Sequence, residues 1–269
     1  MVNKKVLITC ALVLSSLIGC TISGYTGGGR DFTIGQMEGM TDVYFKEFSD
    51  NHGIIPGTTP ELKKSQCIMR ALGRAINGAF AGMRTEWSVE VTRDCSMNAT
   101  VLSNGHLVIS NCVVGMLNNQ DEAAYIIAHA YAHNLLEHDN ERLSTYLSGV
   151  SKKDLNIKKY LRTPDGYNNF TKAVGLPDKE GEILPYTMDH ERAADVFAIQ
   201  MMANAGFNPS GALIVWQNMN TRDELNAEKF RDIHPHSSEY LNELSNLVEG
   251  AMPIYRKMRT EFGRKPMCQ

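Results

Sequence analysis

An apolar segment from Gln120 to Leu136 that carries two histidines constrains the fold most. Its first residues include Asp121 and Glu122, and acidic side chains favour the beginning of a helix because they interact with the helix dipole. Residues four apart lie on one face of a helix, so His129 and His133 can present both imidazoles to one metal ion. Taken alone, the pair is equally consistent with a polar helix face that binds no metal.

A second segment with helical spacing supplies a third ligand type. In residues 190–202, Glu191 and Asp195 share a face and are followed by the apolar residues Val196, Phe197, Ile199 and Met202. Two histidines from one helix and a carboxylate from another form the ligand set of a catalytic zinc site with an open fourth position. We therefore predict a zinc site with the ligands His129, His133 and Glu191. Asp195 would accept a hydrogen bond from a ligand histidine and fix its tautomer. The alternative is a solvated face in which Glu191 and Asp195 pair with Arg192.

Composition and the remaining patterns indicate a packed protein that does not bind nucleic acid. Of the 269 residues 43% are hydrophobic and 21% are charged, with a formal net charge of -3. A pI of about 6.2 without a long basic run argues against a phosphate backbone as partner. Helical spacing predicts an amphipathic helix over Pro60 to Phe80, and alternation predicts a strand over Trp87 to Thr92. The Asn104-Gly105 pair predicts a hairpin turn.

The N-terminus resembles a bacterial lipoprotein signal. Two lysines precede an apolar run that is too short to span a bilayer and that leads to Leu17-Ile18-Gly19-Cys20. The resemblance implies removal of residues 1–19 and lipidation of Cys20. Thr21 resembles the sorting pattern for the inner face of the outer membrane of a Gram-negative bacterium, in the periplasm. The alternatives are an N-terminal anchor helix or a simple cleaved signal.

The sequence after the signal divides into two parts. The glycine-rich stretch from Ser23 to Arg30 is typical of a flexible tether. We therefore expect a tether and N-terminal segment over residues 20–58 and one metallopeptidase-like domain over residues 59–269.

Four cysteines remain outside the signal and the lipidation site: Cys67, Cys95, Cys112 and Cys268. An even number in an oxidising compartment permits two disulfides. The expected hairpin brings Cys95 and Cys112 toward each other. We therefore favour the pairs Cys95 with Cys112 and Cys67 with Cys268 over four free thiols.

Separated motifs resemble one enzyme family in their order along the chain. They are Asn98 to Ile109, Asp121 to Ala124, His129 to His133, Glu191 to Asp195 with Ala205 to Pro209, and His234-Pro235. Over roughly residues 60–247 the chain resembles the HtpX-like and CAAX-prenyl-protease-like zinc endopeptidases, in particular their soluble periplasmic lipoprotein branch. The resemblance implies a gluzincin fold of the α+β class, mostly helical, with a small sheet beside the metal-binding helices.

The resemblance also implies a place for an extended or unfolded polypeptide. In the family an edge strand binds such a peptide by main-chain pairing. The residues that match this edge strand are His106, Leu107, Val108, Ile109 and Ser110.

Two catalytic positions depart from the family pattern. The family has glutamate as general base directly after the first histidine, whereas this chain has Ala130. Loss of a general base typically costs roughly a hundredfold to ten-thousandfold in rate. The family also has a basic residue shortly after its His-Pro, where this chain has Tyr240, although His234 matches and can donate to an oxyanion.

These departures leave three hypotheses. The first is a pseudoprotease that keeps zinc and a peptide groove and acts as a binding, assembly or quality-control factor. The second is an active zinc metalloendopeptidase whose general base is altered or compensated. The third is a scaffold that binds neither metal nor peptide.

The stretch between the two metal-binding segments, Asp139 to Thr187, is polar and rich in turn residues. We expect a surface excursion there rather than a lid over the groove. We expect His138, five residues beyond His133, to be a surface residue. The alternative is a ligand at the open position of the metal.

Overall fold

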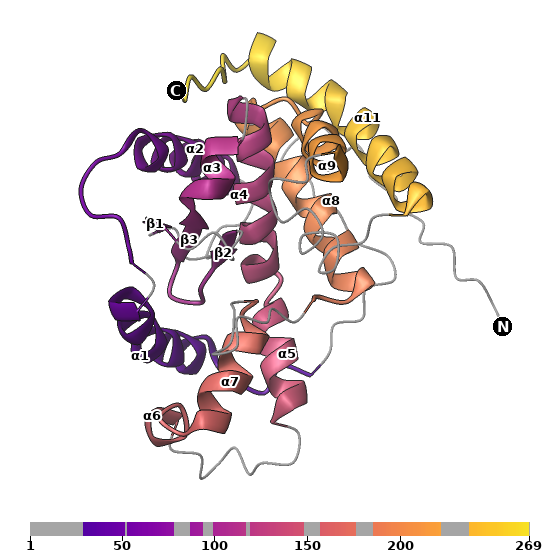
Figure 1. Cartoon of the computed structure of the whole chain (residues 1–269). Helices are drawn as coiled ribbons and strands as arrows, with labels where there is room; N and C mark the ends of the chain where they lie inside the picture. The colour runs from indigo at the N-terminus through magenta and orange to yellow at the C-terminus, as the bar shows by residue number, and fades with distance from the viewer. Residues whose placement is uncertain are drawn as a thin grey trace, which may run out of the picture.

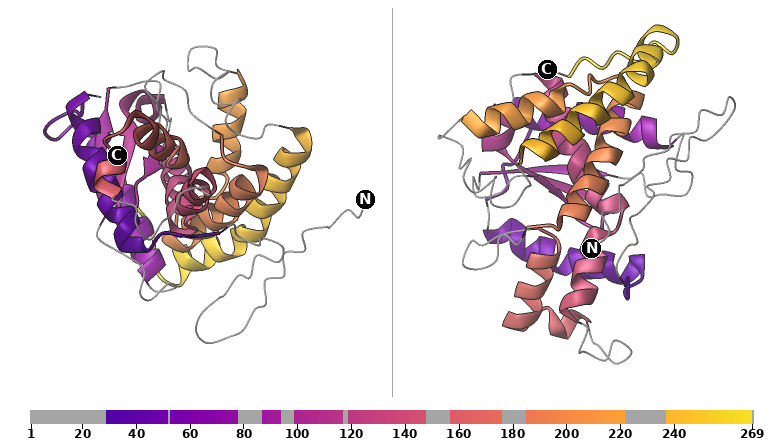
Figure 2. Two further views of the ribbon diagram at one scale, coloured as in Figure 1. Left: turned by 90° about the horizontal axis from the view of Figure 1, so that it is seen from below. Right: turned by 90° about the vertical axis from the view of Figure 1, so that its right-hand side faces the viewer.

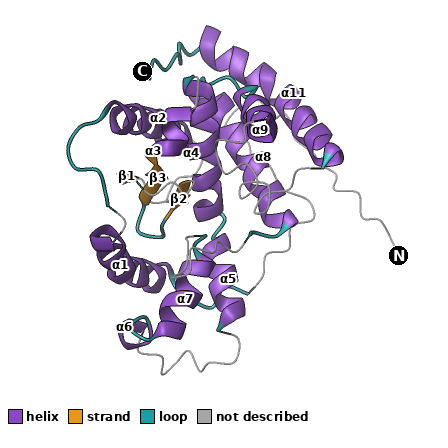
Figure 3. Cartoon of the chain, in the orientation of Figure 1, coloured by secondary structure: helices purple, strands orange, loops and turns teal. Residues whose placement is uncertain are grey.

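The computed structural model describes residues 29–51, 53–77, 87–93, 99–116, 119–147, 157–175, 185–221 and 237–268. The described helices are α1 (Ile34–Asn51), α2 (Pro60–Asn77), α3 (Asn111–Met116), α4 (Gln120–Leu135), α5 (His138–Tyr146), α6 (Ile157–Tyr160), α7 (Pro164–Ala173), α8 (Met188–Ala205), α9 (Gly211–Thr221) and α11 (Ser238–Thr260). The strands are β1 (Ser88–Thr92), β2 (Ala99–Val101) and β3 (His106–Ser110). The predicted fold class is confirmed, since a small sheet lies beside a mostly helical body (Figures 1 and 3).

The sheet has the strand order β1-β3-β2. Strand β3 pairs in parallel with β1 and in an antiparallel direction with β2, where Ala99 lies opposite Ile109. The turn at Asn104-Gly105 connects β2 and β3 as predicted, and Gly105 adopts a φ of 85° that favours glycine. The expectation that residues 106–110 form an edge strand is wrong. Because β3 is central, its main-chain groups bond to both neighbours and are not offered to an extended peptide.

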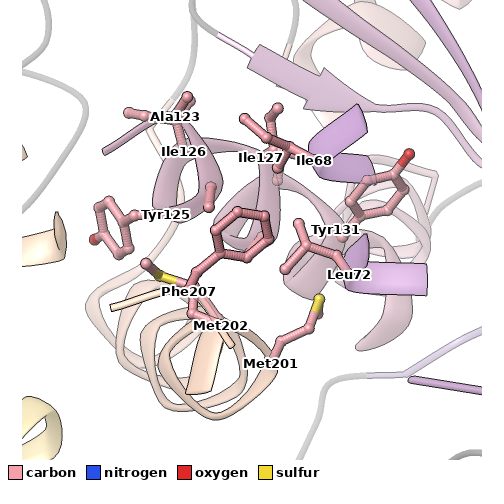
Figure 4. Packing of buried hydrophobic residues seen from close by; sticks show 14 of the residues in the cluster. Ile68, Leu72, Ala123, Tyr125, Ile126, Ile127, Tyr131, Met201, Met202 and Phe207 are labelled. Atoms are coloured by element: carbon pink, nitrogen blue, oxygen red, sulfur yellow. The ribbon is translucent and has the colours of Figure 1, made fainter. Parts of the chain in front are cut away.

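The main hydrophobic core lies around α4, which packs along α8 and against α2 and the sheet. Figure 4 shows side chains from α2, α4 and α8 packed together with Phe207, which follows α8; among them are Leu72, Ile127, Tyr131 and Met202. This position explains the apolar sequence of α4, because a helix surrounded by other elements must be apolar on nearly every side. The predicted helices are confirmed at α2 and α4, although residues 78–80 lie outside the described part of the chain.

A second hydrophobic cluster joins α1 to α5, α6 and α7. These helices gather below the main body in Figure 1 and remain together in the views of Figure 2. Tyr44 and Phe48 of α1 are buried with Leu143 of α5 and Phe170 of α7. The expected surface excursion is therefore wrong for residues 139–147 and 157–175, which are largely helical and contribute to a core. Helix α1 lies within residues 20–58, which we expected to form a tether and N-terminal segment.

Disulfide bonding agrees with the cysteine prediction in the described part of the chain. Cys67 of α2 is bonded to Cys268 near the C-terminus, as predicted. Cys112 is also disulfide-bonded, and its expected partner Cys95 lies outside the described residues. The signal at residues 1–19 and Cys20 lie outside them as well. Within the described helices, none has the length and apolar character needed to cross a membrane.

Candidate metal centre

The three predicted ligands meet at one point between α4 and α8. The Nε2 atoms of His129 and His133 lie 3.0 Å apart. The Glu191 carboxylate places Oε2 3.3 Å from His129 Nε2 and Oε1 3.6 Å from His133 Nε2. One ligand atom from each residue lies within 4.8 Å of the others, and no second group of this kind occurs among the described residues.

The chemistry of this donor set fits zinc. Two imidazole nitrogens and a carboxylate oxygen are preferred zinc ligands, and three protein ligands leave one position open. The Glu191 side chain is 0% exposed, so its charge requires compensation inside the protein. A divalent cation held by Glu191 and the two histidines would supply that compensation.

The orientation of His129 is fixed by a carboxylate on α8. Its Nδ1 lies 2.9 Å from Asp195 Oδ1, which leaves Nε2 directed to the other ligands. Asp195 Oδ1 also accepts a hydrogen bond of 2.7 Å from the Tyr125 hydroxyl, and Asp195 Oδ2 accepts one from the Tyr240 hydroxyl. Tyr125 in turn accepts a hydrogen bond of 3.0 Å from the indole nitrogen of Trp216. Asp195 therefore contacts a ligand histidine in the way the sequence predicted, and two tyrosines hold it in place.

The same carboxylates determine the charge of His129 in the metal-free protein. Burial favours the neutral ring, but hydrogen bonds and charges of Asp195 and Glu191 outweigh it and raise the pKa of His129 to about 10. In the absence of metal, a proton therefore occupies this ligand at neutral pH.

His133 has a different partner, which sequence reasoning did not find. Its Nδ1 lies 2.9 Å from Nδ1 of His138, the first residue of α5. His138 is 0% exposed, so the expectation of a surface residue is wrong. His138 also does not belong to the cluster of ligand atoms, since it contacts the ring nitrogen of His133 that faces away from Glu191. Burial lowers the pKa of His138 to about 2, and its ring is neutral.

An aromatic side chain covers His133 on another side. The Tyr186 ring lies 3.9 Å from the His133 ring, and the Arg142 guanidinium stacks over Tyr186 at 4.0 Å. Burial raises the pKa of Tyr186 to about 12, so its hydroxyl keeps its proton at neutral pH. Tyr186 precedes the first residue of α8 by two positions, and no pattern in the sequence predicts that it covers a metal ligand.

The residue after the first ligand histidine, where the family resemblance implies a general base, carries a methyl group. Ala130 follows the first ligand histidine on α4 and is 4% exposed. The two glutamates nearest to it in the sequence lie in the first turn of α4 and just before α5, and both have other partners. Glu122 accepts a hydrogen bond of 2.7 Å from Asn119, and Glu137 pairs with Arg30 at 3.4 Å. Both glutamates thus have partners of their own, and His234 lies outside the described residues.

Tyr240 does not occupy a vacant catalytic position. It lies in the first turn of α11 with 2% of its surface exposed, and its hydroxyl donates to Asp195. The tyrosine thus supports the carboxylate that orients His129.

Comparison with known proteins agrees with this site. Residues 62–248 match peptidase family M48. Mitochondrial metalloendopeptidase OMA1 of Schizosaccharomyces pombe is 25% identical over 217 residues, which cover 79% of this chain and 61% of that protein. Mitochondrial metalloendopeptidase OMA1 of Saccharomyces cerevisiae is 27% identical over 181 residues, which cover 64% of this chain and 50% of that protein. For the metalloendopeptidase OMA1 of Danio rerio, identity is 22% over 222 residues, with 79% of this chain and 46% of that protein covered.

The chain spans about half the length of these curated relatives. The family match, however, extends over more than half of this chain and includes all three candidate ligands. The chain therefore belongs to peptidase family M48, a family of zinc metallopeptidases.

Proposed function

We propose that this protein binds zinc and extended polypeptide but hydrolyses peptide bonds poorly, and that it acts as a binding or quality-control factor. The observation that carries the proposal is the combination of a complete ligand set with a methyl group at position 130. His129, His133 and Glu191 would hold the ion. A zinc ion bound there would polarise a peptide carbonyl.

Peptide hydrolysis also requires a group that takes a proton from the attacking water and returns it to the departing nitrogen. A methyl group does neither. The described carboxylates that contact the ligand histidines are Glu191, which would hold the ion, and Asp195, which already accepts from His129 and two tyrosines. We therefore expect a rate roughly a hundredfold to ten-thousandfold below that of a chain with a base at this position.

The alternative is an active zinc metalloendopeptidase with a compensating base. One observation favours it: the hydrogen bonds that orient His129 through Asp195, Tyr125 and Tyr240 are all present. The relatives named above are also metalloendopeptidases by name.

The proposed polypeptide partner needs a sheet edge other than β3. Strand β2 lies at one end of the strand order and packs against α4, the helix that carries both histidine ligands. We propose that main-chain pairing takes place along β2. The outer side of β1, in contrast, already bonds to Ile55, whose backbone nitrogen donates to Val91.

We also propose that the protein is a periplasmic lipoprotein anchored through Cys20, at the inner face of the outer membrane. The support is the N-terminal sequence alone, with its short apolar run ending at Cys20. Labelling with a fatty acid should mark the protein, and Cys20→Ser should release it from the membrane fraction. An unlabelled protein with an uncleaved N-terminus would contradict the anchor.

Zinc content and proteolysis test the main proposal. Protein purified without chelator should hold close to one zinc per chain by elemental analysis, and His133→Ala should remove it. The unmodified chain should not cleave casein above a chelator-treated control. Ala130→Glu should produce chelator-sensitive cleavage, whereas the matched variant Ala130→Gln, which has similar volume but no carboxylate, should not.

Two results would contradict this reasoning. Absence of zinc from the purified protein would remove the metal site. Chelator-sensitive cleavage by the unmodified chain at a rate close to that of Ala130→Glu would favour the active endopeptidase.

A further inference from the structure

The second ring nitrogen of the ligand His133 contacts α5, and the role of this contact rests on the zinc site proposed above. A histidine that binds metal through Nε2 carries a proton on Nδ1, and that proton needs an acceptor. His129 has the usual kind of acceptor, the Asp195 carboxylate at 2.9 Å. His133 instead faces Nδ1 of His138, a second imidazole, at 2.9 Å. A neutral imidazole accepts through only one nitrogen, so this bond depends on how the His138 ring is held.

The His138 ring is held by a residue next to the third ligand. It stacks on the ring of His190 with a centroid distance of 4.3 Å and an interplanar angle of 29°. His190 directly precedes Glu191 on α8, and its Nε2 lies 3.2 Å from Oε2 of Glu141. His138, His190 and Glu141 are all buried. Because His138 and Glu141 belong to α5, these contacts connect α5 to both metal-binding helices.

The outer end of this group of contacts is Arg30, at the start of the described chain. Its Nε and Nη2 atoms donate to Glu141 Oε1 at 3.0 and 2.8 Å, and Nη2 also donates to the Leu136 carbonyl at 2.9 Å. Leu136 is the C-terminal cap of α4, the helix that carries His133. The next residues are fixed as well, because the Asn140 side chain donates to the Phe32 carbonyl at 2.8 Å and the Phe32 side chain is buried.

We propose that His138, His190, Glu141 and Arg30 are positioning residues for the metal ligand His133, so that docking of residues 30–32 onto α5 raises the metal affinity of the site. The physical reason is preorganisation: a ligand whose orientation is already fixed loses less entropy when the metal binds. Residues 30–32 would thereby support the metal site through their contacts with α5.

Zinc affinity of the full chain, measured at one fixed pH by competition with a chromophoric chelator, tests this proposal. His138→Leu removes the acceptor and should weaken binding about 10- to 100-fold. His138→Asn keeps an acceptor oxygen near the position of Nδ1 and should recover most of that loss. Arg30→Met should weaken zinc binding by a factor between about 2 and about 30. This is the usual effect of a substitution that acts on a binding site through neighbouring side chains.

Arg264→Met is the matched control. Arg264 anchors the C-terminal segment by donating to the Asn204 carbonyl at 2.7 Å, near the end of α8 that is remote from Glu191. Its loss should lower stability without changing zinc affinity. Arg30 is at the surface, so Arg30→Met should fold. The test therefore remains valid even if His138→Leu does not fold.

The outcomes separate this proposal from the zinc site itself. If the unmodified chain binds one zinc and Arg30→Met binds it equally well, the positioning role is overturned and the zinc site stands. An equal loss of zinc affinity in Arg264→Met would also overturn it, because the loss of affinity would then result from lower protein stability. A chain that binds no zinc at all overturns both proposals. Weaker binding in His138→Leu and Arg30→Met, with recovery in His138→Asn, supports the positioning role.

Discussion

Zinc binding should release close to one proton per ion from this site at neutral pH. In the metal-free protein the pKa of His129 is about 10, because Asp195 and Glu191 stabilise the charged ring more than burial opposes it. A histidine that ligates zinc through Nε2 is neutral, so zinc must displace this proton. Since the pKa in the folded protein lies above the ordinary 6.5, the release persists from about pH 6.5 up to about pH 10.

The displaced proton sets the size of the pH effect. With one proton released, the apparent affinity rises about tenfold for each pH unit, and therefore about a hundredfold between pH 6.5 and 8.5. The free energy of unfolding of the metal-free protein depends on pH in the opposite sense and falls as the pH rises. The contribution of protonated His129 is fully present below pH 6.5 and is lost as the pH rises through about 10.

Calorimetry in two buffers of different ionisation enthalpy measures the released protons directly. Asp195→Asn keeps an acceptor for His129 but removes the negative charge, so it should lower the pKa of His129 and reduce the release at pH 8.5. Asp121→Asn, at the other end of α4, is the matched control and should release as many protons as the unmodified chain. A release below about half a proton at pH 7.5 in the unmodified chain, or an unchanged release in Asp195→Asn, would show that zinc does not displace a proton from His129.

Two further predictions concern stability. Replacing both Cys67 and Cys268 by serine opens a loop with a sequence separation of 201 and should lower the free energy of unfolding in urea by up to about 5 kcal/mol; no change in the midpoint would contradict this. Gly206→Ala should lower the melting temperature, because Gly206 has a φ of 88° and a Cβ there would lie 2.1 Å from the Arg264 carbonyl oxygen. Gly250→Ala, in the open middle of α11, should instead stabilise by up to about 1 kcal/mol, and a melting temperature equal in the two variants would argue against this account.

The parts of the fold that could be predicted from the sequence are those determined by residues close together in the chain. The spacing of His129 and His133 within one apolar helix, and of Glu191 and Asp195 within another, places each group on one helix face. The ligand chemistry of zinc then indicates that the two faces meet, which the structure shows. The hairpin at Gly105 is local in the same sense, because its turn residues alone determine it.

The parts that the sequence missed depend on distant neighbours. The hairpin turn and the family resemblance identify a strand at residues 106–110 but do not establish which strands flank it, and so the central position of β3 was not predicted. The polar sequence of α5 resembles a solvated face. Its charges are nevertheless buried because their partners come from elsewhere, Ser103 for Asp139 and Arg30 for Glu141. Burial of His138 follows from the same packing and has no signal in its own sequence neighbourhood.

Tyr240 is the position where sequence and structure lead to opposite experiments. Judged from the motif, it replaces a basic residue that supports the charged intermediate and that arginine would restore, whereas in the fold its hydroxyl donates to the buried Asp195. Tyr240→Phe leaves that carboxylate oxygen without its donor and should cost about 1.5–3 kcal/mol in urea unfolding, the usual range for a hydrogen bond to a charged group. Tyr131→Phe is the matched control, because the Tyr131 hydroxyl is equally buried and has no hydrogen-bond partner among the described residues. Removing it should cost nothing. Because Asp195 orients His129, Tyr240→Phe should also weaken zinc binding while Tyr131→Phe does not. Equal effects of the two substitutions on stability and zinc affinity would show that Tyr240 acts only by filling space.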